Sequence, residues 1–445
     1  MSLKFGTDGV RGVANTELTP ELALALGRAA GRVLGGSTWL LGRDTRRSGP
    51  MLTAALAAGL ASEGIEVVDL GVLPTPGVAH LAALQQVPAA MISASHNPFA
   101  DNGIKLFAAG GRKLTDEVEE QIEAELVRVS AHIDGPRPQG RDVGPVRLDP
   151  DGVATYRAHL SSAGIEGRRL DGLRVVIDAA NGAASGLAEA ILTDLGAEVT
   201  AIHQDPDGTN INDGCGSTHP ADLQRAVVER GADLGLAFDG DADRVLAVDH
   251  AGVLVDGDEI IGICAIDLHE RGLLVHDTVV VTVMSNLGFR HGMAAHGIEV
   301  VATAVGDRYV LEALDQGGHI LGGEQSGHVI FRRLASTGDG ILTGLTLLDV
   351  VARTGRPLAE LAAATMTRLP QVLVNVRTAR RDPDLLVKLA PDVVAAEAGL
   401  GDRGRILLRP SGTEPVIRVM VEAPTAAEAD EVAHRLADAV RSLAG

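Results

Sequence analysis

Short apolar runs alternate with helix-like segments along almost the whole chain, and this alternation limits the possible folds more than any other feature. For example, the apolar run TWLLGRD (38–44) is followed by a helix-like stretch from Ser48 to Glu63. Strands that alternate with helices of about 10–15 residues predict parallel sheets covered by helices on both faces. The clearest runs are TWLLGRD (38–44), AAMIS (89–93), LRVVIDAANG (173–182), DLGLAFDG (233–240) and TVVVTVMSN (278–286).

Three interruptions of this alternation suggest four domains. The segment 132–152 is rich in Pro, Gly and charge and is typical of a linker, and further seams lie near 248–259 and 367–371. Two to four domains also agree with a length of 445 residues. The expected domains are 1–145, 146–249, 250–367 and 368–445, the last of which is a small α+β unit.

Composition argues against several classes of partner. The chain carries a net charge of −20 and has no basic run with interleaved aromatic residues, so we expect neither nucleic acid nor membrane as a partner. Cys215 and Cys264 lack the spacing of a metal site and are typical of reduced thiols. The N-terminus has no apolar leader, and no apolar run approaches the ~18 residues of a membrane helix. We therefore expect a cytoplasmic protein that gathers arginines locally wherever it binds anions.

A serine in a restricted loop is the first candidate for chemistry. In SASHNPFADNGIK (93–105), Ser93 and Ser95 follow a strand-like run, an Asn-Pro pair restricts the backbone, and Lys105 returns a cation. A hydroxyl at a strand end is a candidate nucleophile, and a turn serine that caps the next element is the alternative. A serine esterase fits poorly because the chain has no GxSxG elbow.

The segment DGDADR is a candidate metal site. If the backbone is extended, Asp239, Asp241 and Asp243 can all face one side. Three close carboxylates repel each other unless a cation lies among them, and hard oxygen ligands favour magnesium over zinc. A solvated acidic turn is the alternative. An EF-hand fails at Arg244 and His250, where Gly and Glu are required; an aspartate-based phosphatase, which usually has Thr or Val where Asp243 stands, is a weaker rival.

Two further loops are suited to a sugar phosphate. Glu324 and Ser326 in LGGEQSGH (321–328) could hydrogen-bond vicinal hydroxyls, although a generic glycine turn is the alternative. In RPSGTEPVIR (409–418), hydroxyls and backbone N–H groups lie between two arginines, which is how a protein without a GxxxxGK[ST] loop can bind phosphate; a surface loop is the alternative. A nucleophile, a metal site, a polyol site and a phosphate site together predict phosphoryl transfer on a sugar phosphate.

The motifs FGTDGVRG, SASHNP, DGDADR, GGEQSGH and RPSGTEP, in this order over the whole chain, resemble those of the α-D-phosphohexomutases. The resemblance implies an α/β fold with three similar α/β domains of mixed, mostly parallel sheets, plus a C-terminal α+β domain, around a central cleft. KFGTDGVRG and GEQSGH most resemble the members that act on glucosamine phosphates. Members that act on mannose or glucose phosphates, which typically have another residue where Gln325 stands, are the alternative.

The resemblance also implies roles for matching positions. The serine directly before the histidine carries the phosphoryl group, which selects Ser95. Catalytic roles fall to Ser95, His96, Lys105, Arg244 and His328, with Lys105 and His328 as proton-transfer groups. One Mg²⁺ is held by Ser95, Asp239, Asp241 and Asp243. Substrate contacts fall to Thr7, Arg11, Gly306, Asp307, Glu324, Ser326, Arg409, Ser411, Gly412, Thr413 and Arg418.

The activity implied by the resemblance converts glucosamine 6-phosphate to glucosamine 1-phosphate, on the route to UDP-N-acetylglucosamine. Phospho-Ser95 donates its phosphoryl group to the sugar and gives a 1,6-bisphosphate. This intermediate reverses its orientation while it stays bound, and its other phosphate returns to Ser95. A sugar 1,6-bisphosphate is expected as activator, and a homodimer is compatible with the family. A phosphatase that releases inorganic phosphate and a catalytically silent sugar-phosphate sensor are the rival classes.

Overall fold

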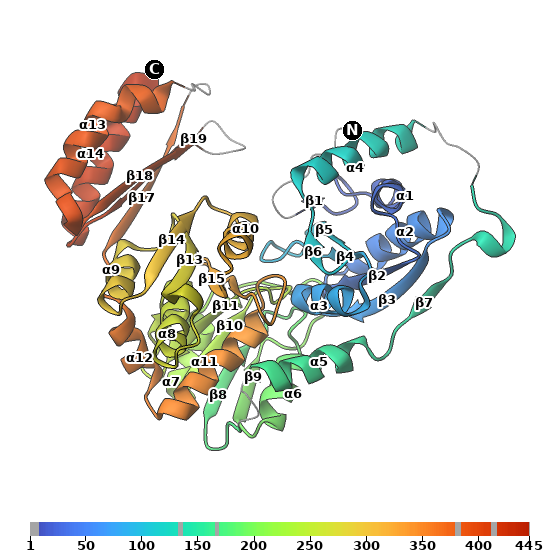
Figure 1. Cartoon of the computed structure of the whole chain (residues 1–445), viewed down its shortest axis with the longest axis horizontal. Coiled ribbons are helices and arrows are strands. Elements are labelled where there is room, and N and C mark those ends of the chain that lie inside the picture. Colours follow the sequence, from blue (N-terminus) through green and yellow to red (C-terminus); the bar gives the residue numbers. More distant parts are fainter. Residues whose placement is uncertain (1–8, 132–136, 165–168, 379–383, 411–415, 445) are drawn as a thin grey trace. The chain divides into compact units, whose positions relative to one another are not determined.

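The structure is a computed structural model that describes residues 9–131, 137–164, 169–378, 384–410 and 416–444. The chain forms two compact units. The first contains the chain up to Met284 together with Ile298–Ala362, and the second contains Ser285–Gly297 together with the chain from Ala363 onward. Figure 1 labels their helices and strands.

The first sheet of the first unit has the order β1-β5-β4-β2-β3-β7, with β6 paired to β5. Its strands are β1 (Val10–Val13), β2 (Thr38–Arg43), β3 (Glu66–Val72), β4 (Ala89–Ile92), β5 (Asp101–Ala108), β6 (Arg112–Lys113) and β7 (Val146–Leu148). Its helices are α1 (Pro20–Leu34), α2 (Gly49–Ser62), α3 (Thr75–Gln85) and α4 (Asp116–Ser130). Alternate residues of β2 face opposite layers: Trp39 and Leu41 share a core with α1, α2 and α4, whereas Gly42 faces Val78 of α3.

Two more sheets complete the first unit. The second has the order β12-β11-β10-β8-β9, and the third has the order β14-β13-β15-β16. Their strands are β8 (Arg174–Asp178), β9 (Glu198–Ile202), β10 (Leu234–Phe238), β11 (Val245–Asp249), β12 (Leu254–Val255), β13 (Thr278–Thr282), β14 (Glu299–Thr303), β15 (Leu321–Gly323) and β16 (Val329–Phe331). Their helices are α5 (Gly152–Ala163), α6 (Leu187–Asp194), α7 (Ala221–Arg230), α8 (Gly257–Glu270), α10 (Asp307–Gly317) and α11 (Gly340–Thr354). Helix α12 (Leu358–Thr365) spans the boundary of the two units, which falls after Ala362.

The three sheets share one four-strand plan. Reading across each sheet, the common strands are β3-β2-β4-β5, β9-β8-β10-β11 and β14-β13-β15-β16. The first three strands of each set are parallel, and the last is antiparallel to its neighbour. The connections before those antiparallel strands contain SASHNP, DGDADR and EQSGH. The three chemical motifs of the first unit therefore occupy equivalent positions in three related sheets.

The second unit contains the antiparallel sheet β17-β19-β18, formed by Gln371–Arg377, Val416–Glu422 and Arg405–Pro410. Helices α13 (Leu385–Leu400) and α14 (Ala426–Ala444) share a hydrophobic core with it. Helix α9 (Leu287–Ala295) also belongs to this unit, and its Leu287 N–H donates to buried Glu422 at 2.9 Å.

Most of the elements predicted from the sequence are present. The predicted fold class is confirmed: three α/β domains with mixed sheets and a C-terminal α+β domain. The helix predicted from Ser48 to Glu63 is α2. The predicted linker at 132–152 is more structured than expected, because β7 within it pairs in parallel with β3. The seam near 248–259 is the β11–β12 hairpin and the start of α8.

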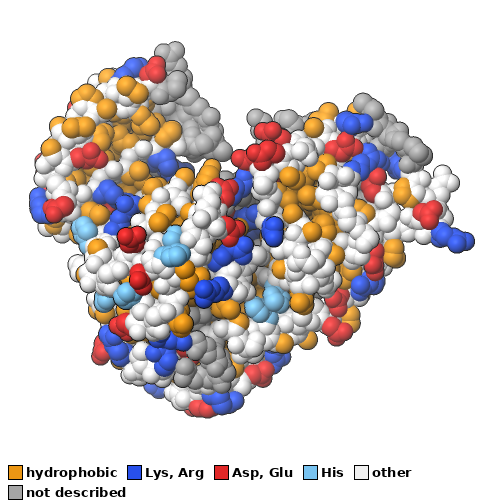
Figure 2. Space-filling model, in the orientation of Figure 1, with side chains coloured by type: hydrophobic (Ala, Val, Ile, Leu, Met, Phe, Trp, Pro, Cys, Tyr) orange, Lys and Arg blue, Asp and Glu red, His pale blue; other side chains and the backbone are white. Residues whose placement is uncertain are grey.

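The surface mixes charges of both signs. On the face shown in Figure 2, Lys and Arg side chains lie among Asp and Glu side chains, with hydrophobic side chains scattered between them. Within the described ranges, none of the helices combines the length and the apolar character that a membrane crossing requires.

Candidate active site

The loop after β4, which carries Ser95, is held in place by Arg46. The Arg46 side chain is buried, and its guanidinium donates to the carbonyl oxygens of Ser95 at 2.9 Å, Asn97 at 2.7 Å and Asp101 at 3.0 Å, and to that of Pro98. One planar group thus satisfies four carbonyls of a loop that forms no regular ladder. The rigidity that the Asn-Pro pair predicts therefore comes largely from an arginine outside the motif.

The two serines of this loop have different partners. Ser93 Oγ donates to Asp44 at 2.6 Å and accepts the Ser95 N–H at 2.9 Å, and Asp44 also accepts from Arg46 Nε at 2.9 Å. Ser93 therefore acts as the turn serine. Ser95 has a φ of 53°, a left-handed conformation that costs about 1–3 kcal/mol and persists only where the surroundings fix it.

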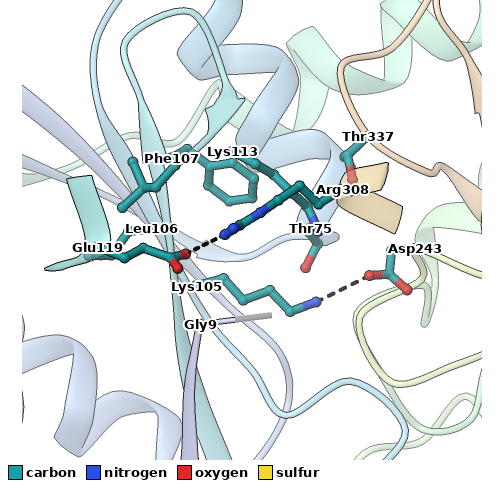
Figure 3. Close-up of a pocket in the computed structure, with 11 residues that line it drawn as sticks. Gly9, Thr75, Lys105, Leu106, Phe107, Lys113, Glu119, Asp243, Arg308 and Thr337 are labelled. Carbon is teal, nitrogen blue, oxygen red and sulfur yellow. Dashed lines mark hydrogen bonds and ion pairs between the residues drawn. The ribbon is translucent and has the colours of Figure 1, made fainter. Parts of the chain in front are cut away.

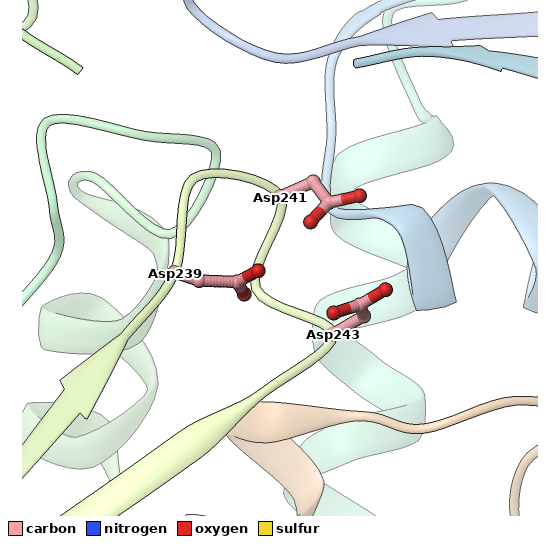
Figure 4. Close-up of side chains that lie close together, drawn as sticks. All are labelled: Asp239, Asp241 and Asp243. Atoms are coloured by element: carbon pink, nitrogen blue, oxygen red, sulfur yellow. The ribbon is translucent and has the colours of Figure 1, made fainter. Parts of the chain in front are cut away.

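Three buried aspartates lie next to the Ser95 hydroxyl, as Figure 4 shows for Asp239, Asp241 and Asp243. One carboxylate oxygen from each lies within 4.8 Å of the others, and Ser95 Oγ donates to Asp239 Oδ2 at 2.7 Å. The segment is not extended as predicted. β10 ends at Phe238, and Ala242 has a φ of 55°, so the carboxylates converge because the chain turns.

This cluster fits a hard divalent cation. Asp241 Oδ1 and Asp243 Oδ1 are buried and accept no hydrogen bond from the part of the chain that the structure describes. Buried acceptors without donors are costly unless a cation is their partner. Burial, followed by the charges of Asp243 and Asp241, raises the pKa of Asp239 to about 8. A cation among the three groups would favour their charged forms.

A close approach of two backbones brings the serine loop onto the aspartate turn. A Cβ at Gly240 would lie 2.6 Å from the Ser95 carbonyl oxygen, so glycine is required for this contact. Asn212 Nδ2 strengthens it by donating to the same oxygen at 2.9 Å and to Asn97 O at 3.1 Å. The Ser95 loop of one sheet and the aspartate turn of the next are thereby joined.

Lys105 lies on the other side of the aspartates, and Figure 3 shows it pointing toward Asp243 from β5. Its Nζ donates to Asp241 Oδ2 at 2.7 Å and to Asp243 Oδ2 at 3.1 Å, and Thr75 Oγ1 donates to the same oxygen of Asp241 at 2.5 Å. Burial would raise the pKa of Asp243, but Lys105, His328 and Arg244 lower it well below its usual range.

His96 lies beside the Ser95 hydroxyl and has a lowered pKa. Burial, followed by the charges of Arg244 and Arg11, lowers the pKa of His96 to about 4. Arg244 Nη1 therefore donates to His96 Nδ1 at 2.9 Å, and Ser95 Oγ lies 3.4 Å from the same nitrogen. Arg11, from β1, contributes positive charge to this edge of the site.

A cavity of about 190 Å³ adjoins the aspartate turn. His328 lies between Asp243, with Nδ1 3.7 Å from Oδ1, and Asp307, with Nε2 3.4 Å from Oδ2. Burial would lower the pKa of His328, but the two carboxylates raise it. The cavity lining consists of Asp243, Arg244, Val305, Gly306, Asp307, Glu324 and His328.

Ser326 lies on the loop between β15 and β16, as Glu324 does, and its Oγ is 3.4 Å from Glu324 Oε2. Glu324 Oε1 accepts the Gly306 N–H at 3.2 Å, which joins the predicted sugar loop to the loop before α10. The first unit thus contains the described site residues predicted from four of the motifs and from the loop at Gly306: Arg11, Ser95, His96, Lys105, Asp239, Asp241, Asp243, Arg244, Gly306, Asp307, Glu324, Ser326 and His328.

The second unit pairs two of the predicted phosphate-binding residues. Arg409 on β18 and Arg418 on β19 are partners in the strand register, so their side chains emerge on one face of the sheet. Burial, followed by the Arg418 charge, lowers the pKa of Arg409. Two adjacent guanidinium groups make a local positive site in an acidic chain. The predicted residues Ser411, Gly412 and Thr413, like Thr7 at the N-terminus, lie outside the described residues.

Several residues of the site were missed from the sequence: Asp44, Arg46, Thr75, Lys113 and Asn212. The segment RDTR directly after the first strand-like run offered a signal, because charged residues at the end of a buried strand need partners. Thr75 and Asn212 stand in unremarkable turn sequences. Lys113 forms an ion pair with Asp307 that only the fold reveals.

Comparisons with known proteins cover the whole chain. Residues 2–132, 154–252, 256–369 and 373–439 match the descriptions "Phosphoglucomutase/phosphomannomutase" alpha/beta/alpha domain I, domain II, domain III and C-terminal domain. A phosphoglucosamine mutase of Frankia alni is 57% identical over 99% of both chains, and one of Rhodococcus jostii is 56% identical over 100% of both. A solved phosphoglucomutase/phosphomannomutase family protein of Burkholderia thailandensis has a TM-score of 0.82 and 26% identity, covering 99% of this chain and 98% of its own.

Proposed function

The chain belongs to the phosphoglucomutase/phosphomannomutase family, and from this premise we propose that it interconverts glucosamine 6-phosphate and glucosamine 1-phosphate. The enzyme is an intramolecular phosphotransferase. The observation that carries the proposal is the 2.7 Å hydrogen bond from Ser95 Oγ to Asp239 within a buried set of three carboxylates.

Ser95 carries the phosphoryl group between the two positions of the sugar. A phosphoserine has a charge of about −1.5 to −2 near neutral pH, and it must be held still beside an anionic substrate. Arg46 and Ser93 fix the loop for this purpose. Mg²⁺, held by Asp239, Asp241, Asp243 and a phosphate oxygen on Ser95, would offset that charge and stabilise the transferring group.

The reaction is two transfers that conserve every phosphate. In the first, the bond from Ser95 Oγ to phosphorus breaks as a sugar hydroxyl oxygen bonds to phosphorus, and the hydroxyl proton passes to a base. In the second, after the 1,6-bisphosphate has reversed its orientation in the site, Ser95 Oγ attacks the other phosphate. The bond from that phosphorus to the sugar oxygen breaks, and the oxygen takes up a proton to become a hydroxyl. The protein mainly supplies positioning and electrostatic stabilisation.

Lys105 and His328 remain the proposed proton-transfer groups. Lys105 Nζ is held by two carboxylates, which favours the ammonium form. A divalent cation on Asp241 and Asp243 would weaken that hold and favour loss of a proton from Lys105, whose neutral amine could then accept the proton of the sugar hydroxyl. His96, neutral and bonded to Arg244, positions that guanidinium over the phosphoryl group.

Of the four proposed domains, 1–145, 146–249, 250–367 and 368–445, the second supplies the metal-binding aspartates and the other three supply the substrate contacts. We assign the sugar hydroxyls to Glu324 and Ser326, with Arg11 and the loop at Gly306 nearby. The non-reacting phosphate falls to the set that contains the paired arginines: Arg409, Ser411, Gly412, Thr413 and Arg418.

Phosphorus NMR tests this proposal directly. The purified chain is given Mg²⁺, a trace of glucose 1,6-bisphosphate as activator, and glucosamine, glucose or mannose 6-phosphate in parallel. We expect the 6-phosphate signal to be replaced by a 1-phosphate signal fastest with glucosamine. Faster turnover of a neutral sugar would make the enzyme a phosphoglucomutase or phosphomannomutase, and release of inorganic phosphate would make it a phosphatase.

Two further parts of the proposal concern the cell. We propose a cytoplasmic enzyme, which fractionation of cells that express a tagged chain would test. A homodimer is the proposed assembly, and light scattering on the purified chain would distinguish it from a monomer.

A further inference from the structure

The 190 Å³ cavity beside the aspartate turn has an acidic wall. Asp243, Asp307 and Glu324 line it, against one guanidinium, that of Arg244, and the imidazole of His328. Asp243 is already balanced by Lys105 at 3.1 Å and belongs to the metal cluster. The negative groups that face the rest of the cavity are therefore Glu324 and the Asp307 carboxylate, which Lys113 and His328 contact through one of its two oxygens.

These two carboxylates lie on adjoining loops. Glu324 Oε1 accepts the N–H of Gly306, the residue directly before Asp307. Among the described residues, no Lys, Arg or His lies within ion-pair distance of Glu324. A carboxylate kept in a concave site without a cation is costly, and a ligand that brings a cation would relieve that cost.

Asp307 presents one free oxygen although the residue is only 8% exposed. Its Oδ2 is bonded to Lys113 and lies 3.4 Å from His328 Nε2. Its Oδ1 accepts no hydrogen bond from the described part of the chain. Lys113, on β6, is not part of the cavity lining. Because it bonds only Oδ2 of Asp307, Oδ1 remains available to a ligand in the cavity.

We propose that Asp307, supported by Glu324, forms a subsite that recognises the protonated amino group of the sugar. This inference rests on the proposed function and names the group that sets its substrate preference. A phosphate would be repelled by two carboxylates, and a neutral hydroxyl would gain only an ordinary hydrogen bond. An ammonium gains a charge-assisted hydrogen bond, which is roughly twice as strong as a hydrogen bond between neutral groups.

The test compares glucosamine 6-phosphate with glucose 6-phosphate in the full-length enzyme with Mg²⁺. Asp307→Asn keeps the size and hydrogen-bonding capacity of the side chain but removes its charge. We expect the ratio of kcat/KM for glucosamine over glucose to fall about tenfold or more, equivalent to ~1.4 kcal/mol. Retained glucose turnover in the same variant shows that the protein is folded.

Lys113→Gln is the matched control, because it breaks the same ion pair from the other side and leaves the Asp307 charge in place. We expect this variant to keep the wild-type ratio or to increase it. A similar fall in Asp307→Asn and Lys113→Gln would mean that the ion pair, and not recognition of the ammonium, sets the preference. An unchanged ratio in Asp307→Asn would also overturn the inference.

A measurement on the wild-type enzyme keeps the inference testable if Asp307→Asn does not fold. Raising the pH removes the proton from the sugar amine, so the glucosamine-to-glucose ratio must fall as pH rises. The charged protein groups around the subsite are Lys113, His328 and Arg244, and loss of positive charge from them would raise the ratio instead, because it would favour a cationic substrate. A ratio independent of pH would overturn the inference alone. A wild-type enzyme that turns over neither sugar would instead overturn the proposed function.

Discussion

The Arg46 guanidinium lies 2.9 Å from the carbonyl oxygen of Ser95 and so connects the end of β2 to the residue proposed to carry the phosphoryl group. The same side chain is paired with Asp44 and is 1% exposed. Its fork donates to four carbonyls of one loop, a geometry that the single ammonium of a lysine cannot reproduce.

Arg46→Lys should therefore leave the fold in place and strongly impair turnover. Lost donors leave buried acceptors unpaired at about 1–3 kcal/mol each, which lowers thermal stability, and a misplaced nucleophile loop can cost about 10²-fold in rate. Activity assays and thermal melts measure both effects. Arg47→Lys is the control, because Arg47 is exposed; a similar loss of activity in it would contradict the assigned role of Arg46.

The two loop serines should respond differently to removal of the hydroxyl. Ser95→Ala should abolish turnover, to below about a thousandth of wild type, because it removes the hydroxyl proposed to carry the phosphoryl group. Ser93→Ala should only weaken it, since the loop loses one hydrogen bond worth about 1 kcal/mol. Labelling with ³²P-glucose 1,6-bisphosphate should mark wild type and Ser93→Ala but not Ser95→Ala. Label that stays on Ser95→Ala would assign the phosphoryl group to another residue.

Removal of the divalent cation should destabilise the protein as well as stop turnover. Without it, three buried carboxylates repel each other, whereas Mg²⁺ at a hundred times its Kd would add about 2.7 kcal/mol to the free energy of unfolding. Melting curves with EDTA and with graded MgCl₂ measure this. Asp241→Asn should shrink the Mg²⁺-dependent rise in Tm, and a rise of wild-type size in that variant would place the cation elsewhere.

Stability should fall in mild acid because of a histidine far from the chemistry. His80 of α3 stacks on His159 of α5 with ring centroids 3.9 Å apart, and burial, followed by the His159 charge, lowers the pKa of His80 from 6.5 to about 4. Below pH 6.5 the unfolded chain binds a proton that the folded chain excludes, so stability is lost between pH 6.5 and 4.

His80→Gln should flatten that decline in a series of urea melts between pH 7 and 4. His434→Gln, which changes an exposed histidine, is the control and should leave the slope unchanged. An identical slope in wild type and His80→Gln would show that other groups cause the acid sensitivity.

The sequence predicted the candidate loops well because the chemistry of each loop is local. Asp239, Asp241 and Asp243 lie within five residues, so their shared role is visible before any fold is known. Arg46 was missed because its acceptors lie some fifty positions further along, beyond the reach of a motif. Thr75, which bonds Asp241 across 166 positions, is a stronger case of the same difficulty.

The fold was predicted in outline and missed in its connections. Apolar runs predicted the parallel strands. No run shows that the strand that follows is antiparallel to its neighbour, because strand direction depends on pairing across the sheet. Nor could the sequence show that residues 285–297 join the C-terminal unit, since Leu287 meets Glu422 across 135 positions. Both features come from long-range pairing, which local periodicity does not encode.

The placement of SASHNP, DGDADR and EQSGH on equivalent connections of three related sheets has an evolutionary consequence. If one ancestral domain was duplicated twice, each copy could keep the same sheet while the sequence of its connecting loop diverged toward a different function. In the proposed function, the first two connections share the phosphoryl chemistry and the third binds the sugar. A change of sugar preference would therefore fall on the third connection and on the neighbouring loop before α10, and would leave the other two connections unaltered.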